Sequence, residues 1–172
     1  LSASVIDGFK EAKGKICVVM DADLSHPITS IPSMIQPILN NQSDITVGSR
    51  HIHGGGLDSW PIHRQLISRV AGGLAIGLSP LSDPTSGFMA VRRGLLNIAQ
   101  LNPIGWKIVL ETVCKHSSYR IQEVPIIFKD RIHGESKLRL TDYLHYIYHL
   151  LQLNQSKYQK YWEFIKFCLV GL

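Results

Sequence analysis

The sequence predicts an α/β fold, in which helices flank a mostly parallel sheet. Residues 16–20 form a short, continuous apolar run that ends in acidic residues, as in a strand buried on both faces of a parallel sheet. A helix-like segment at 31–39 and a second strand candidate at 44–49 follow, which is the strand, helix, strand alternation of an α/β sheet. The 172 residues, 45% of them hydrophobic, suffice for one domain with a sizeable core.

The segments on either side of this unit show helical periodicity. Apolar residues at helical spacing predict a helix that is already under way at 1–12. The glycines at 54–56 predict a mobile loop. Beyond this loop, apolar residues four positions apart predict an amphipathic helix over 61–78; they are Ile62, Leu66, Val70, Leu74 and Leu78.

The second half of the domain is expected to add strands at 87–91 and 124–128, with a helix at 106–113 between them. The chain shows no internal repeat and no low-complexity tract. We therefore expect residues 1–139 to form a single domain.

Two further segments are expected after this domain. From Leu140, apolar residues recur with helical period, and aromatic and histidine residues fill much of the rest. We expect residues 140–157 to form an amphipathic helix of the kind that lies in a membrane interface. The chain becomes apolar from Phe164 to Leu172, which is far short of the roughly 20 residues that span a bilayer, so we expect residues 158–172 to begin a transmembrane region.

Charge and cysteine content narrow the choice of partners. Eighteen Lys and Arg against thirteen Asp and Glu give a net charge of +5, which suits phosphates, nucleic acid or an acidic membrane surface. The three cysteines, Cys17, Cys114 and Cys168, are far apart, which argues against a disulfide framework or a zinc site and fits a reducing compartment. The histidines lack a metalloprotease spacing, and no role is assigned to them.

The strongest chemical signal is the pair of acids Asp21 and Asp23, directly after the first predicted strand. Open α/β sheets place their ligands at the carboxyl ends of their strands. Two carboxylates that emerge there can converge on a hard divalent cation, which in turn neutralises a diphosphate. The alternative is a turn or helix cap, where Asp is common. The preceding strand favours the metal site.

A series of motifs then follows in order along the chain. They are Asp21-Ala-Asp-Leu-Ser-His-Pro27, Val47-Gly-Ser-Arg50, Trp60 with Arg64, Asp83-Pro-Thr-Ser-Gly-Phe88, Gly105-Trp-Lys-Ile108 with Glu111, Glu123-Val-Pro125 and Arg131-Ile-His-Gly-Glu-Ser-Lys-Leu138. In order and number these motifs resemble those of the dolichyl-phosphate mannose synthases, polyprenyl-phosphate sugar synthases of glycosyltransferase family 2. The helix from Leu140 resembles the interface helix that follows in that family.

This resemblance implies a GT-A (Rossmann-like) fold that transfers mannose from GDP-mannose to dolichyl or another polyprenyl phosphate, with inversion at the sugar. It implies Mg²⁺ or Mn²⁺ as cofactor and a membrane-associated active site on the cytoplasmic face. Family members begin with a strand and loop that grip the base and ribose, which here would precede Leu1. The resemblance therefore implies an incomplete N-terminus and a chain that is inactive by itself.

The resemblance also implies roles for individual residues in donor binding. Asp21, Ala22 and Asp23 would hold the nucleotide sugar and its metal, whereas Ser25 stands where some relatives have Gln. Cations at four matching positions would contact the donor diphosphate or the sugar. One of them, Arg131, would be a catalytic residue together with Asp21 and Asp23. The four are Arg50, Lys107, Arg131 and Lys137. For any one of these cations taken alone, a solvated surface charge is the better interpretation. Their positions inside the matching motifs favour a functional role.

The acceptor phosphate is expected on the predicted helix over 61–78. Arg64 and Ser68 lie one helical turn apart, so both can meet one ligand, which in the resembled family is the lipid phosphate. An Arg fork suits a phosphate because it donates two parallel hydrogen bonds. A helix face in water is the alternative. Asp83 either orders the acceptor or metal shell or belongs to an ordinary Asp-Pro turn, and the sequence leaves both open.

Three other functions are alternatives to mannose transfer. A related enzyme could use UDP-glucose or another UDP-sugar on the same kind of lipid, and the motifs do not cleanly choose between the donors. A non-catalytic basic module for nucleic acid would show a basic face with exposed aromatics, whereas these cations fall inside spaced motifs, so no nucleic-acid partner is expected. A degenerate protein that only docks to membrane is disfavoured because both acids are retained.

Overall fold

A computed structural model of the chain describes residues 1–58, 60–75, 77–102, 104–116, 118–130 and 141–154. Two residues predicted to bind the donor, Arg131 and Lys137, lie outside the described residues. So do the end of the expected interface helix and the expected transmembrane start, 158–172. No helix within the described ranges combines the length and the apolar character needed to cross a bilayer.

The centre of the molecule is a four-stranded mixed sheet. Its strand order is β1 (Ile16–Val19), β4 (Met89–Arg92), β2 (Ile45–Ser49) and β5 (Ile121–Pro125). β4 is antiparallel to both of its neighbours, whereas β2 and β5 are parallel. Three strands therefore run in one direction, as a mostly parallel sheet requires, but two of the three pairings are antiparallel. Apolar runs do not encode strand direction, so the sequence could not show this.

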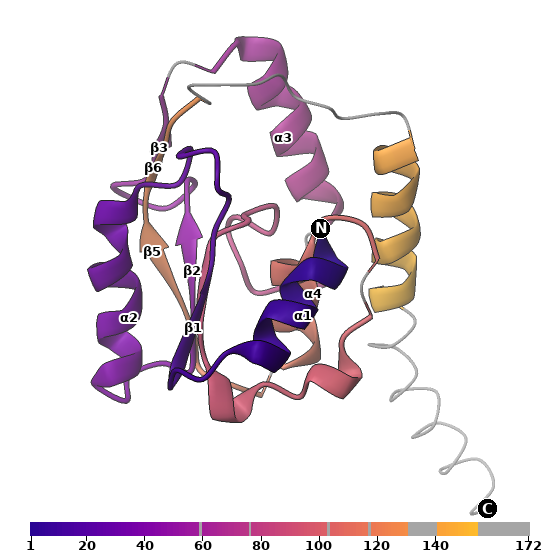
Figure 1. The fold of residues 1–172 in the computed structure, drawn as a ribbon. Coiled ribbons are helices and arrows are strands. Elements are labelled where there is room, and N and C mark those ends of the chain that lie inside the picture. The colour runs from indigo at the N-terminus through magenta and orange to yellow at the C-terminus, as the bar shows by residue number, and fades with distance from the viewer. Residues whose placement is uncertain (59, 76, 103, 117, 131–140, 155–172) are drawn as a thin grey trace, which may run out of the picture.

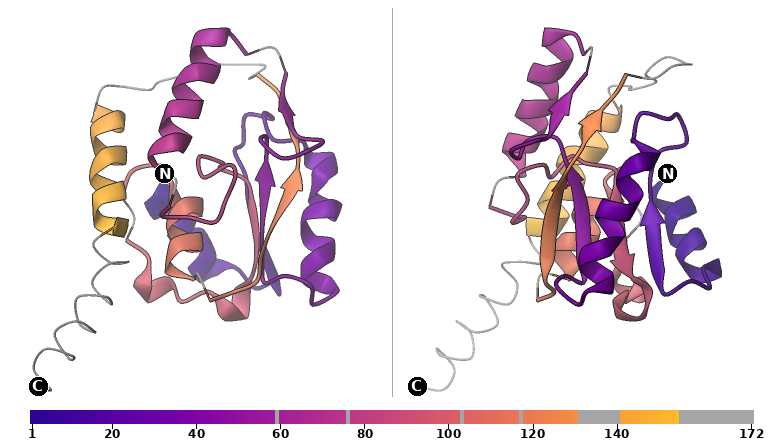
Figure 2. Two further views of the ribbon diagram at one scale, coloured as in Figure 1. Left: turned by 180° about the vertical axis from the view of Figure 1, so that it is seen from behind. Right: turned by 90° about the vertical axis from the view of Figure 1, so that its left-hand side faces the viewer.

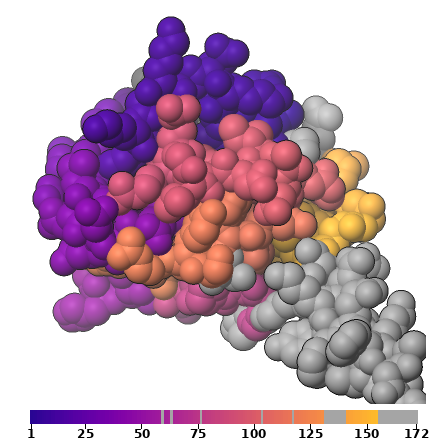
Figure 3. All heavy atoms as spheres, turned by 90° about the horizontal axis from the view of Figure 1, so that it is seen from below, coloured from indigo at the N-terminus to yellow at the C-terminus, as the bar shows by residue number. Residues whose placement is uncertain are grey.

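Helical segments and short 3₁₀ turns surround the sheet. In the described part of the chain the helices are α1 (Ser2–Glu11), α2 (Ile31–Leu39), α3 (Ile62–Leu74), α4 (Ile108–Lys115) and residues 141–154; the turns are η1 (Ile28–Ser30), η2 (Arg93–Leu95) and η3 (Ile98–Gln100). Figures 1 and 2 show α2 on one face of the sheet and α1 and α4 on the other. Seen from below, the region after β4, in salmon, lies between the indigo N-terminal region and the orange region around β5 (Figure 3).

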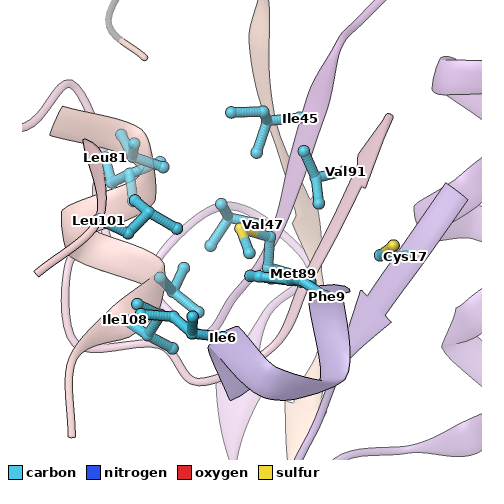
Figure 4. Packing of buried hydrophobic residues seen from close by; sticks show 12 residues of the cluster. Ile6, Phe9, Cys17, Ile45, Val47, Leu81, Met89, Val91, Leu101 and Ile108 are labelled. Carbon is cyan, nitrogen blue, oxygen red and sulfur yellow. The ribbon is translucent and has the colours of Figure 1, made fainter. Parts of the chain in front are cut away.

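Two hydrophobic clusters fill the two faces of the sheet. Alternate residues of β4 point to opposite faces, so Met89 and Val91 join one cluster and Ala90 joins the other. The first cluster packs strand residues against Ile6 and Phe9 of α1 and against α4 (Figure 4). The second packs them against α2. The helices on both faces are thus held by burial of apolar surface.

Several predicted boundaries differ from the observed ones. α3 ends at Leu74 rather than at 78, and Gly77 follows at φ +85°, a conformation outside the α-helix. The strand predicted at 124–128 is instead β5 followed by β6 (Ile127–Phe128). β6 pairs in parallel with β3 (Gly56–Leu57), so part of the predicted loop at 54–56 belongs to a second small sheet. The mobility of this loop stays a prediction.

β1 departs from the expectation of burial on both faces. Cys17 is buried, whereas Val18 is exposed. β1 pairs with β4 alone in the part of the chain that the structure describes, so it is an edge strand there. The acidic pair that follows its carboxyl end nevertheless lines the same cavity as Arg64 and Ser68 of α3.

Candidate active site

The two acids lie in a tight turn directly after β1, at the edge of a cavity of about 740 Å³. The Asp21 amide donates a hydrogen bond to Nδ1 of His26 (3.0 Å). Oδ1 of Asp23 accepts from the amide of Ser25 (3.1 Å) and from its hydroxyl (2.5 Å). Leu24 sits in the left-handed region, at φ +62°. The turn is therefore held by its own side chains, and Ser25, itself buried away from the cavity lining, acts on the site through Asp23.

These acids can hold part of the coordination sphere of a cation. No group of three or more His, Cys, Asp or Glu side chains suited to a metal occurs among the described residues. Carboxylate oxygens are the ligands that Mg²⁺ and similar hard cations prefer, and Mg²⁺ usually binds through one or two carboxylates plus substrate phosphates. Asp21 and Asp23 therefore fit a cation that a diphosphate brings with it.

Arg50, at the end of β2, forms a buried ion pair with Asp83. Its Nε and Nη2 donate to the two Asp83 oxygens at 2.6 Å each, and Nη2 also donates to the Thr85 hydroxyl (2.7 Å). Asp83 is fully buried, and its loop is held by Glu123, which accepts from the amides of Ser82 and Asp83. Asp83 is thus the anchor of Arg50, a role that neither sequence interpretation contained.

Burial and neighbouring charges shift the pKa values of Asp83 and Lys107. Burial alone would raise the pKa of Asp83, but the hydrogen bonds and charge of Arg50 outweigh it and lower that pKa. Lys107, just before α4, donates from Nζ to the Thr85 carbonyl (2.8 Å). Burial, and then the nearby charge of Arg50, lowers the pKa of Lys107 to about 8. Two cations therefore line the same cavity as the acidic turn, each held by the segment 83–85.

α3 presents its polar side to the same cavity. Arg64 and Ser68 both line the cavity. The Arg64 guanidinium stacks 3.9 Å from the Trp60 ring centroid, and its Nη1 donates to Asp130 (2.7 Å). The outward side of α3 is apolar, with Ile62 84% exposed, so the usual orientation of an amphipathic helix is reversed. The polar side is thus not simply a helix face in water.

The structure thereby brings together most of the residues predicted from the sequence. Seven of them line one cavity: Asp21, Ala22, Asp23, Arg50, Arg64, Ser68 and Lys107. Sequence reasoning missed His26 and the contribution of residues 141–154, which add Tyr143, Tyr146 and His149 to the lining. The sequence contained a signal for a role of His26 in the site, because His26 follows Asp23 by only three residues. No role was assigned to it from the sequence alone.

Comparison with known proteins places this site in a family. The model of the family described as glycosyl transferase family 2 matches residues 1–98. This chain belongs to glycosyl transferase family 2. The predicted GT-A-type α/β fold is supported by this match and by solved neighbours. Glucosyl-3-phosphoglycerate synthase from Mycobacterium tuberculosis, in complex with phosphoglyceric acid, superposes with a TM-score of 0.57 at 21% identity, covering 88% of this chain and 54% of that chain.

Three curated relatives carry one name. A dolichol-phosphate mannosyltransferase of Pyrococcus furiosus is 42% identical to this family 2 chain, over all of it and 49% of that protein. Those of Mycosarcoma maydis and Saccharomyces cerevisiae are each 38% identical over 92% of this chain, and over 55% and 62% of their own lengths. The chain thus spans roughly half to three fifths of the relatives that it matches.

Proposed function

We propose that this chain is part of a glycosyltransferase that moves mannose from GDP-mannose to dolichyl phosphate or another polyprenyl phosphate, with inversion at the sugar. The observation that carries this proposal is that an acidic turn, the buried Arg50, the partly buried Lys107 and an Arg–Ser pair all line one cavity. Relatives named dolichol-phosphate mannosyltransferase at 38–42% identity support the acceptor and the sugar.

The donor would bind at the acidic turn, with Asp21 and Asp23 as ligands of Mg²⁺ or Mn²⁺. A solved neighbour, glucosyl-3-phosphoglycerate synthase from M. tuberculosis, is in complex with Mn²⁺ and UDP-glucose at 18% identity and a TM-score of 0.55. When bound, such a cation neutralises diphosphate charge. Arg50 and Lys107, which line the same cavity, would add positive charge near the same leaving group.

The acceptor phosphate would bind at Arg64 and Ser68. One of its oxygens attacks the anomeric carbon and forms the new C–O bond, while the bond from that carbon to the diphosphate breaks and its electron pair leaves with the nucleoside diphosphate. The nucleophile is already anionic at neutral pH, so the step needs no general base. The chain's contribution is then alignment of the two reactants and stabilisation of the leaving group.

We also propose that the site works at a membrane surface, on its cytoplasmic face. α3 and residues 141–154 pack against each other, with the Tyr146 hydroxyl donating to the Ala71 carbonyl (2.7 Å), and lie side by side in Figure 1. Both carry exposed apolar side chains away from the cavity lining: Ile62, Leu66, Val70 and Leu74 on α3, and Leu144, Ile147, Tyr148 and Leu151 on 141–154. This apolar surface beside Arg64 supports a lipid-linked acceptor. The net charge of +5 supports the cytoplasmic face, because that leaflet carries the anionic lipids.

Sugar transfer by membranes that contain the full-length protein tests the reaction. Labelled GDP-mannose or UDP-glucose is offered with Mn²⁺ and a polyprenyl phosphate. Lipid-linked mannose that disappears in Asp23→Ala but persists in Asp7→Ala, an exposed acid on α1, is the expected result. Labelled lipid obtained from UDP-glucose would identify a different donor and leave the proposed mechanism unchanged. The absence of transfer from either nucleotide sugar would refute the proposal.

Vesicle flotation tests the membrane surface separately. Val70→Glu should weaken binding of the protein to vesicles that contain anionic lipid, because it places a charge on the apolar side of α3. Leu39→Glu, on α2, is a matched control, since Leu39 is equally exposed but lies on the other side of the molecule. Equal flotation of both variants and the wild type would contradict this surface.

A further inference from the structure

We propose that His26 is a positioning residue of the acidic turn, whose Nδ1 lone pair holds the Asp21 main chain and so directs both acids toward the donor complex. This inference rests on the proposed metal-dependent transfer. It adds a residue to which the sequence assigned no role.

The position of His26 is defined by contacts on three sides. Its Nδ1 accepts the Asp21 amide at 3.0 Å. Its ring lies between those of Phe88 and Phe128, with both centroid separations 5.1 Å. His26 is only 2% exposed. A side chain enclosed in this way has little freedom to rotate, so the nitrogen that meets Asp21 is fixed.

The hydrogen bond determines which tautomer is present. A main-chain amide can only donate, so Nδ1 must be the unprotonated nitrogen, and the ring proton is on Nε2. The Asp21 carboxylate is no substitute partner, since its Oδ2 lies 4.0 Å from the same nitrogen.

The turn depends on this contact because it lies beyond the sheet. The β1–β4 register ends at the pair Val19–Met89, so Asp21 has no ladder partner there. At the far end of the turn, the Lys129 amide donates to the Ser25 carbonyl (3.1 Å). His26 therefore anchors the entry to the turn as Lys129 anchors its exit. Loss of the entry anchor would let the carboxylates move relative to each other, which a shared cation penalises.

A role as simple core filler predicts a different outcome, and substitution can separate the two. Asn carries an oxygen at the same number of bonds from Cα as Nδ1, so His26→Asn can accept the Asp21 amide. His26→Gln places its oxygen one bond farther away, and His26→Phe fills the aromatic space without an acceptor. Core filling predicts that Phe is the best replacement, whereas positioning predicts that Asn is.

The experiment measures the affinity of the full-length protein for GDP with and without Mn²⁺, with UDP in a parallel series. We expect His26→Gln and His26→Phe to lose about 10- to 100-fold of the Mn²⁺-dependent gain in affinity, the range seen when support of a metal ligand is removed. His26→Asn should stay close to wild type, and the affinity without Mn²⁺ should change little in any variant.

Each other outcome has a distinct meaning. An unchanged Mn²⁺-dependent gain in all three variants would overturn the His26 proposal and leave the transferase function intact. A wild type without any Mn²⁺-dependent gain would overturn the metal-dependent function, and this proposal with it. A long-range ¹H–¹⁵N NMR spectrum of the wild type reports which ring nitrogen of His26 carries the proton, and it does not depend on the folding of any variant. A proton on Nδ1 rather than on Nε2 would refute the proposal directly.

Discussion

Replacement of Asp83 by Asn tests whether the buried ion pair organises the cavity. Asp83 accepts from the Arg50 amide (3.1 Å) as well as from both side-chain nitrogens that face it. The asparagine side chain would keep the volume of the aspartate but remove its charge, and its NH₂ group would oppose one of the Arg50 donors. The Arg50 cation would then stay buried without a counter-charge.

The expected loss of stability follows from this geometry. Removal of one partner of a buried ion pair costs roughly 3–5 kcal/mol, because an uncompensated charge remains in a low-dielectric site. For a chain of this size each kcal/mol shifts the melting temperature by about 2–4 °C, so Asp83→Asn should melt roughly 6–20 °C below wild type. The difference should shrink in acid. The pKa of Asp83 is lowered below its ordinary value of 3.8, so its stabilisation is present above that pH and is lost as the pH falls through the lowered pKa.

Thermal melts of the wild type, Asp83→Asn and a matched control, Asp44→Asn, check this prediction. Asp44 also binds an arginine through two side-chain hydrogen bonds, but that partner, Arg120, is 57% exposed. Solvent screens the exposed Arg120 guanidinium and can hydrate it after the substitution, so Asp44→Asn should cost less. Equal losses in the two variants, or a loss below about 1 kcal/mol for Asp83→Asn, would refute the assignment of Asp83 as a buried anchor.

Three further predictions concern the cavity and its supports. Because the pKa of Lys107 is lowered to about 8, donor affinity should fall as the pH rises through that value. The free energy of unfolding should rise between about pH 8 and 10.5, because in that range the unfolded chain binds one proton more than the folded chain. Donor titrations and thermal melts over this pH range check the two directions. Gly55→Ala should lower the melting temperature, since its Cβ would lie 2.5 Å from the last carbonyl oxygen of β2, whereas Gly73→Ala, with nothing within 4 Å on α3, should stabilise the protein by up to about 1 kcal/mol. Trp60→Leu should raise KM for the acceptor phosphate about 2- to 30-fold and KM for the donor less, because the Trp60 ring centroid lies 3.9 Å from the Arg64 guanidinium but 5.8 Å from that of Arg50; an unchanged acceptor KM would contradict that role.

Much of the fold was predictable because its signals are local. Residues 16–19 form a strand and 31–39 form a helix, as their apolar patterns predicted. The sequence also predicted the acidic pair at a strand end and the Arg64–Ser68 pair on a helix. The predicted ends of helices and strands were wrong where a single residue or a partner distant in the sequence determines the end. α3 stops before Gly77, and the strand at 121–128 divides because Ile126 bonds to Ser49 and Gly56, far away in the chain.

Strand and helix order, the position of the acidic pair and membership in the family were therefore determined by the sequence alone, because each depends on residues within a short window or on motifs in order. The tertiary structure alone decided that β4 is antiparallel to both neighbours, that α3 exposes its apolar side and that Arg50 is anchored by Asp83. The last contact joins residues 33 positions apart. Partners at such distances are selected by packing and by the need to satisfy buried polar groups, and these conditions exist only after the chain has folded.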